Sequence, residues 1–301
     1  MTIGPAPDER PEPDRYREVW VERPGDVSVY ASATGDPGAP ALLILDGIGC
    51  SGWAFRRIVP LLAERLCVVQ THYPGHGRSP QPPKPWALSM PDLADHAAAV
   101  LDALAIERAS VVGFSMGFQV ALELYRRHRS RVTALVSLAG PSGKTLSTFQ
   151  GTDVFGHVLP LLRAATRHAS VTTLRLWRSV LPSKWLPWVG LHTQLNPMRI
   201  ELSDLEFYLR QMAEIHPELF LDMLGEAARH VGEDLLPAVR VPTLVIAGAQ
   251  DRFVPADALR KIAFAIPTAQ WMVIEDGSHA LPAEYGPELA ARLLEFTDEL
   301  A

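Results

Sequence analysis

The sequence predicts an α/β fold in which a mostly parallel, twisted sheet carries helices on both of its faces. Short, continuously apolar runs rich in β-branched residues alternate with stretches whose apolar residues recur three and four positions apart. This alternation is typical of parallel sheets, because each crossover between two parallel strands needs a helix. The stretch 141–232 departs from it, since its helical patterns are not interrupted by strand-like runs. We expect that stretch to be a helical insertion.

The composition predicts a folded protein with a large core. The chain has 301 residues, of which 48% are hydrophobic, and this is enough for one large α/β domain with an insertion. The formal charge of −6 is spread along the chain, so no basic stripe for nucleic acid or an anionic membrane is expected. No apolar run is long enough to span a bilayer. Residues 1–15 are rich in Pro, Asp and Glu and lack the apolar segment of a secretion signal, which predicts a flexible tail and a cytoplasmic protein.

The sequence contains two cysteines and none of the common metal- or cofactor-binding motifs. Cys50 and Cys67 are the only cysteines, and their apolar surroundings favour reduced structural thiols. No Cys/His cluster has the spacing of a zinc site, and neither a G-x-G-x-x-G motif nor a P-loop is present. We expect no metal and no organic cofactor.

Strands and helices can be placed in order along the first half of the chain. Turn residues at 23–26 separate two short strand patterns, which predicts an antiparallel hairpin. In order, we expect hairpin strands at 19–21 and 27–31, buried strands at 41–45 and 66–70, and helices at 55–65 and 91–104.

The remaining strands lie on both sides of the insertion. We expect strands at 109–112 and 132–138 before it, strands at 243–247 and 270–274 after it, and a final helix at 287–300. The expected organisation is therefore a core of residues 16–140 and 233–301 that is interrupted by a helical cap at 141–232.

A strand pattern passes through Gly113-Phe114-Ser115-Met116-Gly117 directly into a helical pattern at 118–125. The two glycines allow strand and helix to pack closely around a strained turn with Ser115 at its apex. Backbone N–H groups at the start of the helix then stabilise negative charge beside Ser115. This is a nucleophile elbow in its strand–turn–helix context. The alternative is an ordinary turn in which Ser115 caps the helix.

Two further side chains follow strand ends and are candidate partners of Ser115. His279 comes just after the strand 270–274, and Asp251 just after the strand 243–247. Reacting groups in a parallel sheet collect at the carboxyl ends of the strands, and the order Ser, Asp, His suits this architecture. A serine hydroxyl becomes a good nucleophile when a neighbouring imidazole takes its proton. The structural alternatives are a loop or capping role for His279 and a helix N-cap for Asp251.

Other histidines are weaker candidates for the base. His72 and His76 also follow a strand end, and we assign a loop-bracing role to His76. His128 lies at the far end of the helix after Ser115 and is expected to point away from the site.

The motifs that carry these residues make the chain similar to the α/β-hydrolase family over nearly its whole length after the tail. They are Gly113-Phe114-Ser115-Met116-Gly117, Gly75-His76-Gly77-Arg78-Ser79, Gly248-Ala249-Gln250-Asp251 and Gly277-Ser278-His279. The resemblance is specific for fold and triad and says little about substrate.

The resemblance implies a role for each site residue. Ser115 would be the nucleophile, His279 the general acid and base, and Asp251 the group that orients the imidazole. The backbone N–H groups of Ile48 and Met116 would form the oxyanion hole. The helical insertion would be a lid over the site.

The sequence departs from the family pattern at two positions. Most relatives have His-Gly where this chain has Asp46-Gly47, and a second glycine where it has Phe118. Asp46 either braces its loop by accepting backbone N–H bonds, which we favour, or contacts a polar part of the substrate. Phe118 is expected to pack.

The predicted activity is hydrolysis of a carboxylic ester, thioester or lactone through an acyl-enzyme on Ser115. A perhydrolase, an acyltransferase, a carbon–carbon bond hydrolase, or a ligand-binding receptor or pseudoenzyme on the same fold are the alternatives. The small-molecule substrate would meet a mainly apolar pocket. The candidate substrate-binding residues are Asp46, Phe114, Trp177 and Trp185.

Overall fold

The computed structural model describes residues 15–86, 88–143, 154–183, 186 and 195–300. Its eight strands form one sheet in the order β1-β2-β4-β3-β5-β6-β7-β8. The pairs β1–β2 and β2–β4 are antiparallel, and all other neighbouring strands are parallel. The strands are β1 (Tyr16–Arg23), β2 (Val27–Thr34), β3 (Ala41–Leu45), β4 (Cys67–Thr71), β5 (Ala109–Phe114), β6 (Val132–Leu138), β7 (Thr243–Gly248) and β8 (Ala269–Ile274). The predicted fold class is confirmed.

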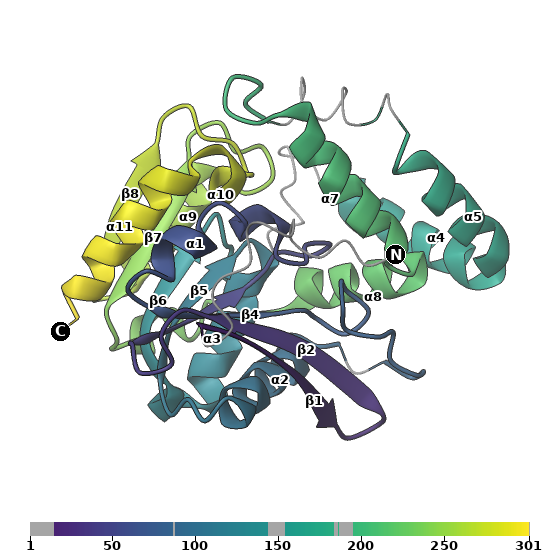
Figure 1. Cartoon of the computed structure of the whole chain (residues 1–301). Helices are drawn as coiled ribbons and strands as arrows, with labels where there is room; N and C mark the ends of the chain where they lie inside the picture. Colours follow the sequence, from purple (N-terminus) through teal and green to yellow (C-terminus); the bar gives the residue numbers. More distant parts are fainter. Residues whose placement is uncertain (1–14, 87, 144–153, 184–185, 187–194, 301) are drawn as a thin grey trace.

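Helices cover both faces of the sheet (Figure 1). One face packs against α2 (Met90–Ala103), α3 (Met116–Arg127) and α9 (Ala256–Ala265), and the other against α1 (Val59–Leu62) and α11 (Gly286–Asp298). Successive side chains of a strand point to opposite faces, so each apolar strand serves two cores. In β3, for example, Leu43 and Leu45 belong to the first core and Leu42 and Ile44 to the second.

Of the two helices predicted at 55–65 and 91–104, the second is confirmed and the first is mostly wrong. The helix expected at 91–104 is α2, and its start is fixed by a capping box in which Ser89 and Asp92 exchange backbone hydrogen bonds. The helix expected at 55–65 is wrong over most of its length. Only the 3₁₀ turn η3 (Trp53–Phe55) and the single turn of α1 form there. Pro60 lacks an N–H group and clashes with the preceding turn, so the α-helix begins just before it.

Between β6 and β7 the described residues form helices and no strand. The helices are α4 (Val154–His168), α5 (Ser170–Val180), α7 (Leu202–Glu214) and α8 (Pro217–Arg229). An isolated bridge between Gly143 and Val231 joins the two ends of this segment at the core. No helix in the described part of the chain is long and apolar enough to cross a membrane. The predicted tail, except for Arg15, lies outside the described residues.

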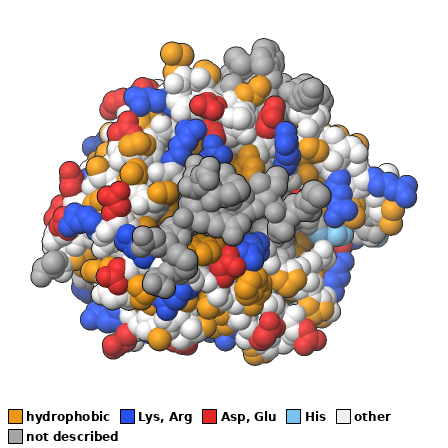
Figure 2. Space-filling model, viewed as in Figure 1, with side chains coloured by type: hydrophobic (Ala, Val, Ile, Leu, Met, Phe, Trp, Pro, Cys, Tyr) orange, Lys and Arg blue, Asp and Glu red, His pale blue; other side chains and the backbone are white. Residues whose placement is uncertain are grey.

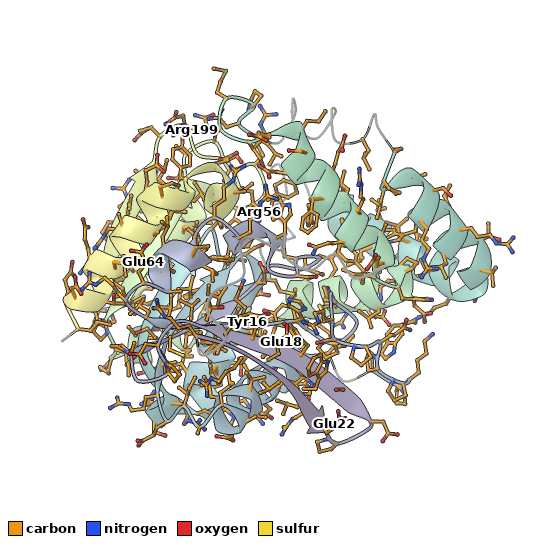
Figure 3. All side chains as sticks on the ribbon, viewed as in Figure 1. Tyr16, Glu18, Glu22, Arg56, Glu64 and Arg199 are labelled. Carbon is orange, nitrogen blue, oxygen red and sulfur yellow. The ribbon has the colours of Figure 1, made fainter. Side chains whose placement is uncertain are left out.

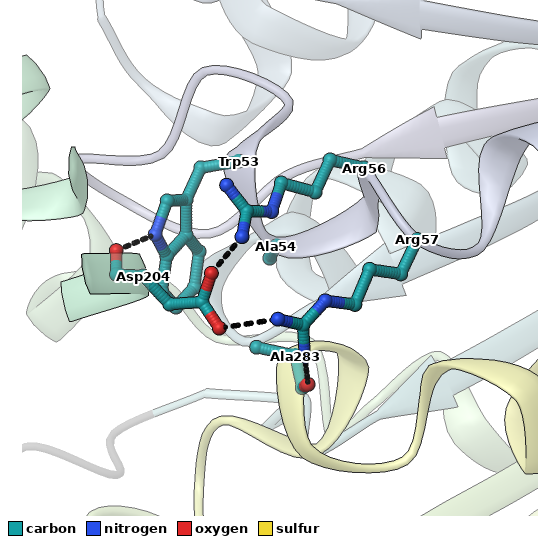
Figure 4. Close-up of a pocket in the computed structure, with 6 residues that line it drawn as sticks. All are labelled: Trp53, Ala54, Arg56, Arg57, Asp204 and Ala283. Carbon is teal, nitrogen blue, oxygen red and sulfur yellow. Dashed lines mark hydrogen bonds and ion pairs between the residues drawn. The ribbon is translucent and has the colours of Figure 1, made fainter. Parts of the chain in front are cut away.

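An ionic cluster fastens the start of α7 to the core (Figure 4). The buried carboxylate of Asp204 accepts hydrogen bonds from the guanidinium groups of Arg56 and Arg57, which follow η3. The indole of Trp53 donates to the backbone oxygen of Asp204 at 2.6 Å. Figure 3 labels Arg56 and, above it in this view, Arg199, which lies just before α7 and pairs with Glu288 of α11. The segment before and at the start of α7 is therefore tied to the core.

Candidate active site

The turn between β5 and α3 holds Ser115 in a strained conformation. Its backbone has φ 51° and ψ −125°, which a residue with a side chain rarely adopts. A Cβ atom at Gly113 would lie 2.4 Å from the backbone of Phe118, and one at Gly117 would lie 2.0 Å from the oxygen of Leu45. Both positions therefore need glycine, and the turn has the geometry that the sequence predicted.

The structure brings Ser115, His279 and Asp251 together at the carboxyl end of the sheet. Nε2 of His279 lies 2.9 Å from the hydroxyl oxygen of Ser115, and Nδ1 of His279 lies 2.7 Å from Oδ2 of Asp251. The residues come from three different loops, after β5, β8 and β7. A nucleophile, a base and an orienting acid in hydrogen-bond contact can together activate a hydroxyl group.

The surroundings of His279 fix its ring. The side chain of Asp251 is completely buried, and its Oδ1 accepts backbone hydrogen bonds from Phe253 and Val254. The aromatic rings of Phe114 and Phe253 lie 5.5 and 5.1 Å from the imidazole, centroid to centroid. Phe114 is thus a neighbour of the His279 imidazole. One ring nitrogen of His279 contacts Asp251, and the other contacts Ser115.

The loop after β3 runs beside Ser115. A Cβ atom at Gly47 would lie 3.3 Å from Cβ of Ser115, so the next residue, Ile48, is close to the hydroxyl group. Met116 is the first residue of α3, and its N–H has no acceptor within its own helix. Among the described residues, neither this N–H nor that of Ile48 donates to a protein acceptor. Both are available for an oxyanion.

Asp46 is the first residue of this loop, and its carboxylate binds backbone N–H groups at both ends of the loop, at Gly47 and Gly52. Its Oδ1 accepts the N–H of Gly47 at 3.0 Å, and its Oδ2 accepts the N–H of Gly52 at 2.7 Å. Tyr73 donates its hydroxyl to the backbone oxygen of Asp46. Burial raises the pKa of Asp46 to about 6, against the opposing effect of the donors from Gly52, Gly47 and the Cys50 thiol. The arrangement agrees with a loop brace.

Side chains of α7 and α8 pack against this loop. The phenol oxygen of Tyr208, a ring carbon of Phe220 and the side chain of Met212 come within 3.2 to 3.6 Å of where a Cβ atom of Gly49 would be. Trp177 lies one layer further out, because its ring contacts Phe220 and its N–H donates to the oxygen of Met212. Trp185 lies outside the described residues.

Another buried carboxylate, that of Glu284, holds the loop that carries His279. It accepts the N–H and the hydroxyl of Ser278, at 2.9 and 2.5 Å. The same carboxylate accepts the backbone N–H of Asn196 at 2.8 Å, and the amide of Asn196 donates to the oxygen of Asp276. One side chain therefore links the insertion to the residue directly before His279.

The other histidines and Phe118 have structural positions. His76 is completely buried, and burial lowers the pKa of His76 to about 4, so the ring stays neutral beside the oxygen of Pro74. His128 pairs with Asp95 at the far end of α3. Phe118 is fully buried, and a Cβ atom at Gly140 would meet its side chain at 2.4 Å.

The sequence reasoning missed Tyr208, Phe220, Phe253 and Glu284. Phe253 and Glu284 follow Asp251 and His279 by two and five positions, and this nearness is a local signal that could have found them. Tyr208 and Phe220 reach the site from helices of the insertion, and their helical spacing gives no sign of which face meets the loop.

Comparisons with known proteins agree with this geometry. Residues 40–284 match the model of the alpha/beta hydrolase fold. A 2-hydroxy-6-oxononadienedioate/2-hydroxy-6-oxononatrienedioate hydrolase of Burkholderia vietnamiensis is 30% identical, covering 92% of this chain and 93% of its own. A 2-hydroxymuconate semialdehyde hydrolase of a Pseudomonas species is 29% identical, covering 87% and 88%. A thermophilic esterase of Thermogutta terrifontis has a similar structure, with a TM-score of 0.76, 22% identity, and 94% and 99% of the two chains covered.

Proposed function

Because this chain belongs to the alpha/beta hydrolase fold family, we propose that it is a serine hydrolase that acts through a covalent acyl intermediate on Ser115. The observation that carries the proposal is the continuous contact from Ser115 through His279 to Asp251, with distances of 2.9 and 2.7 Å. In this proposal the residues of the insertion, 141–232, form a cap over the site.

The proposed reaction has two halves. In the first, Ser115 attacks the carbonyl carbon while His279 takes the hydroxyl proton, and the N–H groups of Ile48 and Met116 bind the oxyanion. His279 then gives the proton to the leaving alcohol. In the second half, His279 takes a proton from water, the hydroxide attacks the acyl carbon, and the acid leaves as Ser115 regains its proton. Asp251 stabilises the imidazolium in both halves.

The first candidate substrate is a carboxylic ester, thioester or lactone with an apolar acyl or alcohol part. The side chains against the loop at Gly49 and against the His279 ring are uncharged. They are Tyr208, Met212, Phe220, Phe114 and Phe253. These side chains offer apolar contact and no ion pair, which suits a neutral substrate.

The second candidate is hydrolysis of a carbon–carbon bond next to a ketone. The two curated relatives named above favour it, since both are hydrolases of 2-hydroxy-6-oxo or related semialdehyde compounds. The same serine, base and oxyanion donors would serve, with a carbon leaving group in place of the alcohol. A charged substrate of this class would gain no ion pair from the five side chains around the site.

The test combines a probe with a substrate panel. A fluorophosphonate should label the protein at Ser115, and Ser115→Ala should lose the label and about a millionfold in rate while the unfolding temperature is kept. Kinetics should then compare p-nitrophenyl esters from acetate to palmitate, thioesters, lactones and 2-hydroxymuconate semialdehyde. A faster reaction with the semialdehyde than with every ester would replace the first candidate by the second. An active Ser115→Ala variant would remove both.

A further inference from the structure

The outward side of the helix pair α4–α5 exposes several apolar side chains. We define the outer α4–α5 face by Val158, Leu161, Leu162, Val171 and Leu176, whose exposed fractions range from 39% to 70%. The three residues on α4 recur three and four positions apart, so they share one side of that helix. The buried Leu159 lies about 100° around α4 from Val158, on the side that packs against α8. The outer face is thus separate from the packing that holds the helices in place.

The charge of this part of the chain is of one sign. The sequence from 154 to 200 contains no Asp or Glu, and its cations are Arg163, Arg167, Arg175, Arg178, Lys184 and Arg199. The expectation that charge is spread evenly along the chain is therefore wrong here. Arg163 and Arg167 turn inward to Asp222 of α8. Arg175 and Arg178 are exposed on α5 and form no ion pair with a carboxylate of the described residues.

Other exposed helix sides of this protein look different. On α7, Glu206 pairs with Arg210, and on α11, Arg292 pairs with Glu299. Mixed charge of this kind is usual for a side that faces water. Figure 2 shows hydrophobic and basic side chains interspersed at the right-hand edge, where Figure 1 places α4 and α5.

The exposed apolar and basic side chains of the outer α4–α5 face indicate which kind of partner can bind there. A second copy in a twofold dimer would present the same patch, in which the stretch 154–200 has no Asp or Glu to pair with Arg175 and Arg178. An anionic lipid surface offers an apolar layer below a layer of phosphates. Helices that bind such surfaces combine Leu and Trp on one side with Arg or Lys beside them.

We propose that the outer α4–α5 face docks on the surface of an anionic lipid bilayer. Leu161 and Leu176 enter the boundary between headgroups and acyl chains, and Arg175 and Arg178 bind the phosphates. The docking requires no catalysis at Ser115. It places the helices that roof the candidate site next to the lipid phase.

Flotation of the full chain with vesicles tests the proposal. The protein should float with vesicles of phosphatidylglycerol and phosphatidylcholine in equal parts, and much less with phosphatidylcholine alone. Raising the salt concentration should release it. The double variant Leu161→Asp/Leu176→Asp should lose at least about tenfold in partitioning at an unchanged unfolding temperature, because both side chains are exposed. Arg175→Gln/Arg178→Gln should lose about tenfold with the anionic vesicles only.

Two controls make the result specific. Phe264→Asp changes a side chain on α9 that is 77% exposed, and this variant should float like the unaltered protein. Ser115→Ala should also float normally, which separates this proposal from that of the hydrolase. The proposal is overturned if the protein ignores anionic vesicles, or if Phe264→Asp loses as much binding as the double variant. It is equally overturned if light scattering finds a dimer that Leu161→Asp/Leu176→Asp dissociates, because a second copy then covers the face.

Discussion

The loops after β3 and β7 each carry a buried aspartate, and the two carboxylates are used differently. Asp251 gives one oxygen to the backbone of its own loop and the other to His279. Asp46 gives both oxygens to its loop, at Gly47 and Gly52. Residue type and place at the sheet edge are the same in both cases. The difference is whether the backbone of the loop uses both carboxylate oxygens. Asp251 keeps one oxygen, Oδ2, as an acceptor for His279, and Asp46 does not.

We expect the largest loss of activity when the carboxylate of Asp251 is changed. Asp251→Asn should lower kcat about ten-thousandfold, because the amide favours the imidazole tautomer that cannot take the proton of Ser115. The amide oxygen can still accept from Phe253 and Val254, so the unfolding temperature should change little. Steady-state kinetics and calorimetry measure both. Asp257→Asn, an exposed aspartate on α9, is the matched control. A loss of less than about tenfold would show that Asp251 does not orient the base.

Glu284 is a buried carboxylate that contacts Ser278, the residue directly before His279. Glu284→Ala should lower kcat about a hundredfold, since the loop before His279 loses its anchor and small displacements are costly in catalysis. It should also cost about 2 to 4 kcal/mol of stability, because the N–H groups of Ser278 and Asn196 lose their acceptor. Glu284→Gln keeps one acceptor oxygen and should restore part of the rate.

The exposed Glu288 on α11 provides the control for this variant. Glu288→Ala should leave kcat unchanged. Equal losses of rate in both variants would mean that α10 (Leu281–Glu284) and α11 affect the site through general stability and not through the loop of His279.

The next effect concerns Asp46 as a brace. Asp46→Ala should lower kcat about tenfold by loosening the loop that carries the N–H of Ile48, a smaller loss than removal of an oxyanion donor. Asp46→Asn should lose only a few-fold, since its amide oxygen still accepts one backbone N–H. Both changes should be the same for every ester tested. A loss confined to hydroxylated or amino esters would assign Asp46 to substrate binding.

The smallest effect is one of pH and stability. The pKa of Asp46 is raised from 3.8 to about 6 in the folded state, so the folded protein holds this proton more tightly than the unfolded chain. Stability from this group is present below about pH 4 and is lost as the pH rises through about 6. The loss is at most about 3 kcal/mol. The unfolding free energy of the protein relative to Asp46→Asn should fall over this window. A difference that stays constant from pH 4 to pH 7 would contradict it.

Local patterns were sufficient to predict the sheet and to place Ser115, Asp251 and His279 together at one edge of it. The turn at Ser115 is defined by two glycines within five residues, and Asp251 and His279 each follow an apolar strand. Parallel strands bring such positions to one edge without any knowledge of side-chain packing. The sequence also predicted the hairpin of β1 and β2 and the free thiols of Cys50 and Cys67, which the structure contains.

The remainder depends on contacts between distant segments. The helical periodicity of 55–65 was interpreted without the effect of Pro60, which moved the start of the α-helix. Tyr208 and Phe220 reach Gly49 from segments about 160 and 170 positions away, and spacing along a helix does not define which helix faces which loop. The link between Asn196 and Glu284 spans 88 positions and has no pattern in the sequence.

The two anchors of the segment before α7 limit how the insertion can be exchanged between relatives. A chimera joined at 141 and 232 would carry a foreign chain past Glu284 and the Arg56–Arg57 pair. Those groups would then face residues that did not evolve with them. A donor without an aspartate at 204 would lack the carboxylate that pairs with both Arg56 and Arg57. The transferable unit is therefore shorter than the insertion and ends before Leu195, so that Asn196 and Asp204 stay with the core they hold.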